Sequence, residues 1–409
     1  MSATDASSLR RVSYFGILAQ ERGGSNSAAE MIPKSLSDCI PGVLSKAQLS
    51  ELCKENLIQS PPDRTTIDYS SIDLTLSKDG YLMTKGSVKP FGESYEAFIK
   101  SASDFRKTLK PDRDDSFILE KKHTYVFRLE QQLGREIDDH EIYGQATAKS
   151  SVGRVDVLAR LIVDGMDAYE SFDPQGVRKG NGHLYVEVTP ITFDVRVKPG
   201  IALSQLRLFY GHPDGAEMRT KELYRSVLRG GKRDGCLRVN LDAARIGRDS
   251  GCAFSASPTS KPQPVRLWKQ DPRPNPRDYW KLEPAVVIKQ KNHLQITKEQ
   301  FYLLRSKEKV ALPGGIAVYC RAIDETIGEM RIHYAGFVHP FFGRDRRDRK
   351  VGTPLIFEVR GHDVDVLLGA SEKMARLIFY RMSKDCTEMV PSDYSDQTLQ
   401  LSSFFGEWN

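Results

Sequence analysis

Residues 149–154 (KSSVGR) are the stretch of this sequence whose residue types are best suited to chemistry. They place a lysine, two serines, a glycine and an arginine within six positions. Two cations beside two hydroxyl donors can bind an anion, because charge-assisted hydrogen bonds to phosphate or carboxylate oxygens are strong. A lysine-serine-serine string before a strand also occurs in simple turns, so the remainder of a site has to be found elsewhere in the chain.

An internal repeat connects this segment to a glutamate in the second half of the chain. The run LYVEVTPITFDVRV aligns with PLIFEVRGHDVDVLL at a constant offset of 171 residues, which pairs Glu187 with Glu358 and superposes the apolar positions. Further upstream, an offset of 175 places residues 151–164 over residues 326–339. Such self-similarity indicates two copies of one domain. The difference between the two offsets falls in a loop, where insertions are tolerated.

The two copies differ most where chemistry would take place. At the offset of 175, the acidic string 324–329 (DETIGE) stands opposite the basic segment 149–154, and its carboxylates would repel a phosphate. On the following strand, the second copy has Ala335, followed by Gly336, where the first has the bulky Arg160. One composite pocket per chain is therefore predicted, with cations from the first copy and room for a ring in the second.

The elements expected to position these residues are mostly strands. Short β-branched runs between Gly, Pro and Asp residues dominate the sequence and predict a mainly β fold with a few short helices. Helical spacing is limited to residues 45–58, where Ser45 is a candidate N-cap, and to residues 220–229.

The length of 409 residues favours two domains over one. We expect them at residues 40–245 and 246–409, with the proline-rich stretch 258–280 at the junction or at the start of the second domain. Residues 1–39 are rich in Ser, Ala and Gly and lack the apolar core of a secretory signal. A flexible extension is expected there, with a transit peptide as the alternative.

The composition limits the classes of partner. No apolar run is long enough for a membrane-spanning helix, so a cytoplasmic protein without a membrane partner is expected. The formal charge of +6 is small for this length, and no nucleic-acid-binding motif accompanies it, so no nucleic acid partner is expected. The six cysteines form no CxxC pair, which gives no sign of a structural zinc site.

In these motifs the chain resembles the dCTP deaminase branch of the trimeric dUTPase superfamily, in a long form with two tandem, fused β-barrels of the β-clip or jelly-roll type. AKSSVGR resembles the family's basic, double-serine, glycine and arginine segment, and LIFEV resembles the strand that carries its catalytic glutamate. YAGFVHPFFG (334–343) resembles its alanine hairpin. SSIDLTLS (70–77) and YSDQTLQLS (394–402) are similar to an N-terminal strand and to the tail that folds over bound nucleotide.

The resemblance implies hydrolytic deamination of dCTP to dUTP and ammonia, at a site built between two barrels. Glu358 would act as the base, Ser150 would position the attacking water, and Arg154 would orient Glu358 or the base carbonyl. The residues implied in substrate binding are Lys149, Ser151, Ala335, Gly336, His339, Tyr394 and Gln397. Mg²⁺ would arrive with the triphosphate, without protein ligands of its own. The H-x-E and P-C-x-x-C signatures of zinc deaminases do not occur, so no zinc is expected.

Two departures from the family pattern keep other functions open. His339 stands where the family has an aspartate, and Phe341 replaces the glycine that follows the proline. They favour one alternative, a nucleotide-binding regulator without turnover. The resemblance leaves a second alternative, dUTP diphosphatase activity alone or coupled to deamination, because the same fold hydrolyses the α,β-phosphate bond elsewhere in the superfamily. The nucleotide ligand would be dCTP or dUTP in each case, and the sequence leaves both a monomer and a homo-oligomer open.

Overall fold

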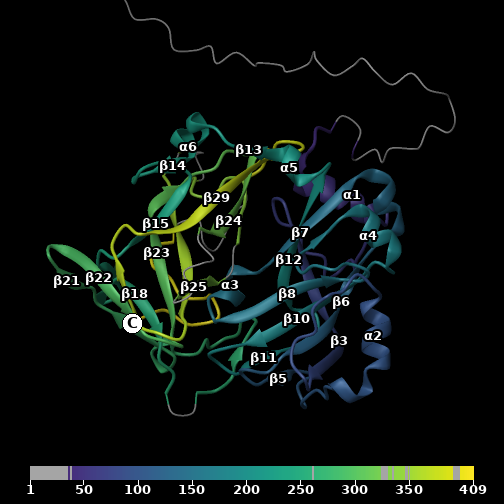
Figure 1. Cartoon of the computed structure of the whole chain (residues 1–409), viewed down its shortest axis with the longest axis horizontal. Helices are drawn as coiled ribbons and strands as arrows, with labels where there is room; N and C mark the ends of the chain where they lie inside the picture. The colour runs from purple at the N-terminus through teal and green to yellow at the C-terminus, as the bar shows by residue number, and fades with distance from the viewer. Residues whose placement is uncertain are drawn as a thin grey trace, which may run out of the picture. The chain divides into compact units, whose positions relative to one another are not determined.

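Strands predominate in the computed structural model of the chain, which confirms the predicted mainly β fold (Figure 1). The structure describes residues 36, 39–259, 262–323, 330–333 (backbone only), 336–345, 349, 351–389 and 397–409. All of them belong to one unit, Pro33–Asn409. Within these ranges no helix is long and apolar enough to cross a membrane.

Ten strands from the first half of the chain form one antiparallel sheet. Its main path is β8-β10-β6-β3-β12-β7-β9, and β1, β2 and β4 pair with β12, β6 and β3. These strands are β1 (Gly42–Val43), β2 (Ile58–Gln59), β3 (Ile72–Met83), β4 (Arg106–Thr108), β6 (Tyr125–Leu133), β7 (Ile142–Ala148), β8 (Val157–Val163), β9 (Ser171–Phe172), β10 (His183–Pro190) and β12 (Ala202–Tyr210). A smaller sheet consists of β5 (Phe117–Leu119), β11 (Val195–Val197) and β19 (Val265–Arg266).

Eleven strands from the second half form a corresponding sheet, with the main path β20-β18-β23-β15-β29-β24-β26. They are β13 (Glu217–Met218), β14 (Leu228–Arg229), β15 (Cys236–Asn240), β18 (Ala253–Ala256), β20 (Trp280–Glu283), β23 (Phe301–Val310), β24 (Ile316–Ala322), β25 (Met330–His333), β26 (Phe337–Val338), β27 (Thr353–Gly361) and β29 (Lys373–Arg381). The described part of this half also contains two small sheets. They consist of β16 (Ala244–Ile246) with β17 (Asp249–Gly251), and of β21 (Val286–Ile288), β22 (Lys291–Ile296) and β28 (Val366–Gly369).

The helices are short, as predicted. They are α1 (Lys46–Lys54), α2 (Tyr95–Ser101), α3 (Ser150–Gly153), α4 (Pro174–Lys179), α5 (Pro213–Ala216) and α6 (Lys221–Val227), with the 3₁₀ turns η1 (Ser103–Phe105), η2 (Arg135–His140) and η3 (Pro276–Asp278). The expected N-cap of α1 is present, because the backbone N–H of Ser45 donates to Oε1 of Gln48 at 2.9 Å in a capping box. The Gln48 side chain also donates to the Ser383 hydroxyl at 3.2 Å and so connects the two halves of the chain.

The internal repeat is visible in the strands. The bounds of β12 and β29 differ at both ends by the predicted offset of 171. The upstream offset of 175 was wrong, however. Glu187 lies opposite Arg160 in the β10–β8 register, whereas Glu358 lies opposite His333 in the β27–β25 register. The counterpart of Arg160 is therefore His333 and not Ala335, because sheet register, which sequence spacing does not reveal, decides which residues correspond.

Along the chain, the strands begin to pair within the second large sheet before the predicted domain boundary between residues 245 and 246. β13, β14 and β15 already pair with β29 and β23 of the second sheet. Conversely, β19 returns to pair with β11 beside the first sheet. The two halves therefore exchange segments, and a single cut between residues 245 and 246 does not separate them.

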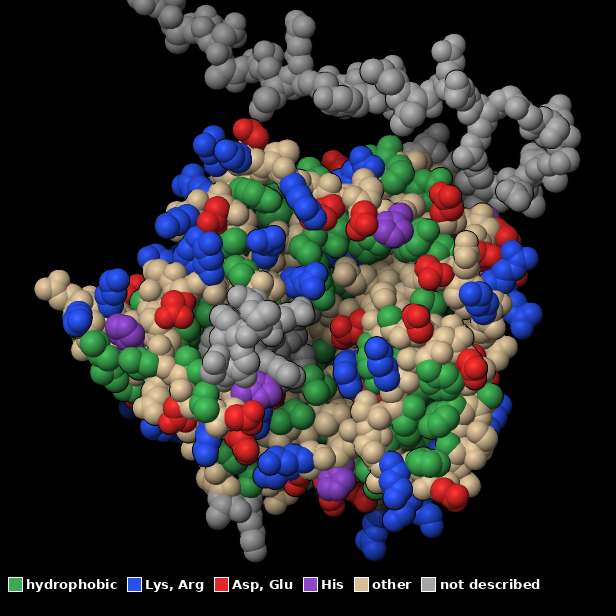
Figure 2. All heavy atoms as spheres, in the orientation of Figure 1, with side chains coloured by type: hydrophobic (Ala, Val, Ile, Leu, Met, Phe, Trp, Pro, Cys, Tyr) green, Lys and Arg blue, Asp and Glu red, His purple; other side chains and the backbone are tan. Residues whose placement is uncertain are grey.

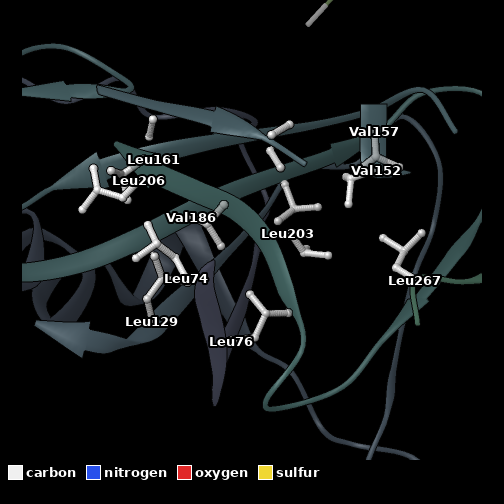
Figure 3. Packing of buried hydrophobic residues seen from close by; sticks show 14 of the residues in the cluster. Leu74, Leu76, Leu129, Val152, Val157, Leu161, Val186, Leu203, Leu206 and Leu267 are labelled. Atoms are coloured by element: carbon white, nitrogen blue, oxygen red, sulfur yellow. The ribbon is translucent and has the colours of Figure 1, made fainter. Parts of the chain in front are cut away.

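We call the structure built on the ten-stranded sheet the first barrel and that built on the eleven-stranded sheet the second barrel. The core of the first barrel includes residues from the C-terminal segment. Leu74, Leu129 and Leu206 are fully buried or nearly so between its strands, as Figure 3 shows. The same apolar cluster extends to Phe405 and Trp408. The Trp408 ring lies 5.0 Å from that of Phe254, and its indole N–H donates to Asp249 at 2.9 Å. The C-terminal segment is thus anchored by burial of large apolar side chains.

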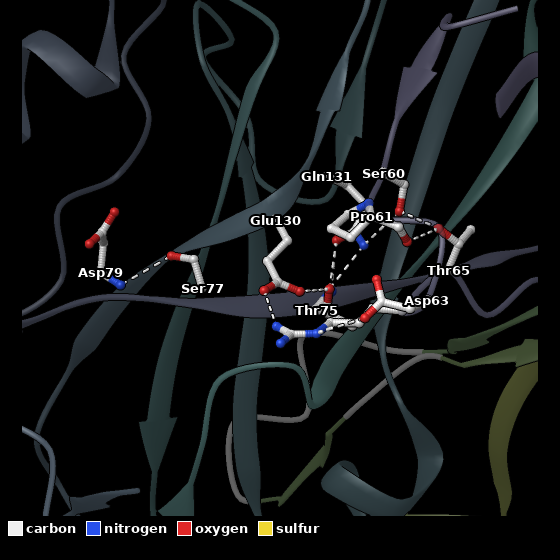
Figure 4. A network of polar contacts seen from close by, with 10 residues as sticks. Ser60, Pro61, Asp63, Thr65, Thr75, Ser77, Asp79, Glu130 and Gln131 are labelled. Carbon is white, nitrogen blue, oxygen red and sulfur yellow. Dashed lines mark hydrogen bonds and ion pairs between the residues drawn. The ribbon is translucent and has the colours of Figure 1, made fainter. Parts of the chain in front are cut away.

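Polar contacts fix the strand that carries the SSID motif. In Figure 4 the Thr75 hydroxyl of β3 donates to Glu130 of β6 at 2.8 Å, and the Gln131 side chain reaches both Thr75 and Ser60. These bonds satisfy polar groups that the barrel buries.

Some hydrophobic side chains remain on the surface. Figure 2 shows them gathered near β21 and β22, where Val286 and Val287 are exposed.

Candidate active site between the two barrels

The KSSVGR segment forms a single helical turn at the end of β7. Val152 of α3 is fully buried in the first barrel, near Val157 and Leu203 (Figure 3). The backbone N–H of Lys149 donates to the carbonyl of Leu203 at 3.0 Å. Val152 thus anchors the turn, and in Figure 1 α3 lies between the labelled strands of the two large sheets, close to β8 and β25.

Glu358 of β27 reaches this turn from the second barrel. A Cβ atom on residue 153 would lie only 2.6 Å from Oε2 and 2.9 Å from Oε1 of Glu358. Real Cβ atoms do not approach oxygen this closely, so glycine at position 153 is what allows the carboxylate to lie over the turn. The predicted association of Glu358 with the KSSVGR segment is therefore present in the structure.

The surroundings of Glu358 favour its protonated form. Its side chain is buried, and burial raises its pKa well above the usual range, although the Arg154 guanidinium opposes the shift and the Asp156 carboxylate adds to it. The nearby thiol of Cys320 is held neutral, since burial raises its pKa to about 12. A carboxyl group with a raised pKa is a stronger base when it does ionise, as proton transfer near neutral pH requires.

Arg154 is held by the C-terminal segment. Its Nη2 atom donates to Oε1 of Gln397 at 2.6 Å, and its Nη1 atom donates to the carbonyl of Gln400 at 3.4 Å. Gln397 also donates to the carbonyl of Pro354 at 2.9 Å, which lies on β27, the strand that carries Glu358. The Ser402 hydroxyl bonds to the carbonyl of Ser151 at 2.7 Å. The tail therefore closes over the KSSVGR turn.

Replacing Gln397 by alanine is expected to lower kcat/KM, for the deamination of dCTP that the family resemblance implies, by about tenfold or more, since a hydrogen bond to a charged group contributes roughly 1.5–3 kcal/mol. The Arg154 guanidinium would lose the side chain that orients it. Gln400→Ala is the matched control, because Gln400 contacts Arg154 through its backbone carbonyl, which the substitution keeps. Steady-state rates of ammonia release would measure both. Equal losses in the two variants would contradict the role of the Gln397 side chain.

Lys149 does not face the site as an unpaired cation. Its ammonium group forms an ion pair with Asp73 of the SSID motif, and burial raises the pKa of that carboxyl. A phosphate entering the site would have to compete with Asp73 for this lysine.

One cavity of about 680 Å³ brings these groups together. Its lining includes eight residues predicted from sequence, namely Lys149, Ser150, Ser151, Arg154, Gly336, His339, Glu358 and Gln397. The two other predicted residues, Ala335 and Tyr394, lie outside the described residues. Asp68, Asp73 and Gln205 also line the cavity and were missed, although the SSIDLTLS string contains Asp73.

His339 lies at the side of the cavity with polar neighbours from the first barrel. Its Nδ1 atom is 3.2 Å from the Ser70 hydroxyl, and its Nε2 atom is 3.8 Å from Asp68. Burial lowers its pKa well below the usual range, and the Arg207 cation acts in the same direction. The imidazole is therefore neutral near pH 7 and offers one donor and one acceptor.

Glu187, the counterpart of Glu358 in the first copy, is already bonded to side chains of its own barrel. Glu187 is buried and forms an ion pair with Arg160. It also accepts hydrogen bonds from the Ser87 hydroxyl at 2.6 Å and the Tyr169 hydroxyl at 3.1 Å. These partners satisfy its oxygens and leave it no role at the composite site.

Family models match both halves of the chain. Residues 40–212 match the N-terminal domain of 2′-deoxycytidine 5′-triphosphate deaminase, and residues 217–405 match the C-terminal domain of the same enzyme. The chain belongs to the 2′-deoxycytidine 5′-triphosphate deaminase family. Deamination of dCTP is accordingly its function.

The fold of a solved deaminase agrees with this membership. The crystal structure of 2′-deoxycytidine 5′-triphosphate deaminase from Agrobacterium tumefaciens is similar over 84% of this chain and 96% of that chain, with a TM-score of 0.72 and 24% identity. A comparison with curated proteins finds no match. The two family models meet between residues 212 and 217, where the strands also change sheet.

Proposed function

We propose that this deaminase hydrolyses the C4 amino group of dCTP at one composite site per chain. The observation that carries the proposal is the position of Glu358, a residue of the second barrel, over Gly153 of the first, in a cavity that Arg154 and Ser150 also line. No such arrangement surrounds Glu187, whose oxygens are bonded to Arg160, Ser87 and Tyr169.

The proposed reaction adds water to C4 and expels ammonia. Glu358 would accept a proton from the attacking water, whose oxygen forms a bond to C4, and the proton would pass to N3 of the ring. Glu358 would then take the proton of the new C4 hydroxyl group and pass it to the C4 amino group, so that ammonia leaves as the C4–N bond breaks and a carbonyl remains on the ring. Ser150 would position the water, and Arg154 would stabilise the charge on Glu358.

The triphosphate is proposed to lie toward the basic turn. Lys149 and Ser151 line the cavity there, and Lys149 can exchange Asp73 for a phosphate oxygen. Mg²⁺ would enter as part of the nucleotide substrate. Among the described residues no group of three or more His, Cys, Asp or Glu side chains could hold a metal, so its ligands would come mainly from phosphate oxygens and water.

The pH profile of the reaction should reflect the raised pKa of Glu358. The base must be ionised, so kcat/KM is expected to fall as the pH drops through that pKa, which lies above the roughly 4.3 of an ordinary glutamate. His339 stays neutral across this range, and His339→Asn should leave the position of the acidic limb unchanged. An acidic limb at or below pH 4.3 in the wild type would contradict this assignment.

A second candidate function is dUTP diphosphatase activity, alone or coupled, because a cavity with Lys149 beside hydroxyl groups suits a phosphate chain. Measuring ammonia and pyrophosphate release from dCTP and from dUTP separates the two. Ammonia from dCTP without pyrophosphate from either nucleotide supports deamination alone. Binding of dCTP with release of neither product would instead identify a regulator without turnover.

A further inference from the structure

A pair of opposite charges, Asp156 and Arg360, joins the two barrels beside Glu358. On the first barrel, Arg154 and Asp156 are two positions apart in the turn that ends α3. On the second, Glu358 and Arg360 are two positions apart on β27 and therefore project from the same face of the strand. Nη1 of Arg360 lies 2.6 Å from Oδ2 of Asp156. Each barrel thus contributes one cation and one anion to the contact.

The Asp156–Arg360 pair is removed from water. The Asp156 side chain is fully buried, and that of Arg360 is 14% exposed. The Thr192 hydroxyl donates to Oδ2 of Asp156 at 2.6 Å and accepts from Arg360 at 3.0 Å. Oδ1 of Asp156 is buried without a hydrogen-bond partner among the described residues. Burying a polar atom without a hydrogen bond costs free energy, and the exceptions in folded proteins often lie at functional sites.

The local backbone directs Asp156 to this place. Asp156 has a φ of 57°, in the left-handed region. Its N–H donates to the carbonyl of Gly153, and its own carbonyl accepts from Ile191, both at 2.9 Å. The residue that holds Arg360 is thus rigidly connected to Gly153, the residue over which the Glu358 carboxylate lies.

We propose that Asp156 and Arg360 are positioning residues whose ion pair fixes the α3 turn to β27 and thereby holds the Glu358 carboxylate at the reacting centre. The inference rests on the proposed function. Neither residue lines the nucleotide cavity, so both act through Glu358. The first copy has no equivalent pair, since Thr189 stands at the repeat position of Arg360.

The pair also tunes the charge of Glu358. Among the described side chains, the charged and titratable groups that interact with this carboxyl are Arg154 and Asp156 from the turn and Cys320 from β24, and Arg360 projects from the same face of its own strand. Asp156 raises the pKa of Glu358 by repulsion, while burial raises the pKa of Asp156 itself to about 6. Removing the Asp156 charge should therefore make Glu358 a weaker base.

The test measures kcat, KM for dCTP and the pH dependence of kcat/KM by ammonia release. For Asp156→Asn we expect kcat to fall about tenfold or more, KM to change less than roughly threefold and the acidic limb to move to lower pH. For Arg360→Gln we expect the same fall in kcat. Its acidic limb should move to higher pH if Asp156 stays charged and to lower pH if Asp156 takes up a proton, because only the charged carboxylate repels Glu358. Arg360→Lys should restore the wild-type limb and part of kcat.

The control is Arg238→Gln, which breaks a buried ion pair with Glu308 at 3.0 Å in the second barrel, away from the cavity. It should lower the melting temperature and leave KM and the acidic limb unchanged.

A folded Asp156→Asn variant with wild-type kcat, or with an unmoved limb, would overturn the inference. If Asp156→Asn does not fold, the kcat and the acidic limb of Arg360→Gln and Arg360→Lys test the inference in its place. Loss of folding in all three variants would overturn it, because the pair would then serve stability alone. A wild-type chain that releases no ammonia would instead refute the proposed function.

Discussion

Replacing Glu358 by glutamine is expected to reduce ammonia release from dCTP by at least about 10²–10⁴-fold, the usual contribution of a well-placed general base. Glutamine keeps the size and the hydrogen-bonding capacity of the side chain, so it should still fit over Gly153. It cannot accept the proton of the attacking water. We therefore expect kcat to collapse while the affinity for dCTP, measured by equilibrium binding, changes little.

The internal repeat supplies a matched control for this experiment. Glu187→Gln changes the same residue type at the equivalent strand position of the first barrel, and it should leave kcat within about twofold of the wild type. Its expected effect is lower thermal stability, since Arg160 would lose its charged partner. If Glu187→Gln proved as inactive as Glu358→Gln, a single composite site could not be the catalytic arrangement.

The second large effect is expected from Gly153→Ala. The added Cβ would lie 2.6 Å from a Glu358 oxygen, so the carboxylate must move. A displacement of the reacting group by about 1 Å lowers the rate roughly 10²-fold. Position 153 is helical and has an ordinary φ, and alanine is preferred to glycine in helices by about 1 kcal/mol. We therefore expect a stable protein with about a hundredfold lower kcat.

Gly215→Ala is the appropriate control for this glycine. Gly215 also lies in a short helix, and a Cβ atom there would meet no other atom within 4 Å. The rate of this variant should match that of the wild type. Circular dichroism and melting temperatures would verify folding in both variants. A Gly153→Ala enzyme with full activity would show that the Glu358 carboxylate does not have to lie over the turn.

Several parts of the fold and of the site could be predicted because they depend on local patterns. Alternation of apolar residues identified the strands around Glu187 and Glu358 and their offset of 171 residues, since each strand buries one face. The N-cap at Ser45 follows from bonds made within one turn. The KSSVGR segment was recognisable because residue types alone indicate anion binding.

Other parts were decided only by pairings between distant segments. The counterpart of Arg160 is His333 because of a strand register that no spacing encodes, and the second sheet recruits strands from before residue 245. The ion pairs of Lys149 with Asp73 and of Asp156 with Arg360 could not be foreseen either. Each joins residues that only the folded barrels bring together.

By itself, the sequence determined the mainly β architecture, the duplication and the basic segment suited to an anion, because periodicity and charge are properties of short stretches. Its resemblance to the dCTP deaminase family supplied the residues expected to deaminate a pyrimidine. The resemblance had already indicated Glu358 as the base, and only the tertiary structure decided what each of the two equivalent glutamates contacts. Glu187 is neutralised by Arg160 on the neighbouring strand, whereas Glu358 extends over Gly153 of the other barrel. These contacts depend on strand register and on packing across the barrel interface, which joins segments some two hundred residues apart and leaves no trace in local spacing.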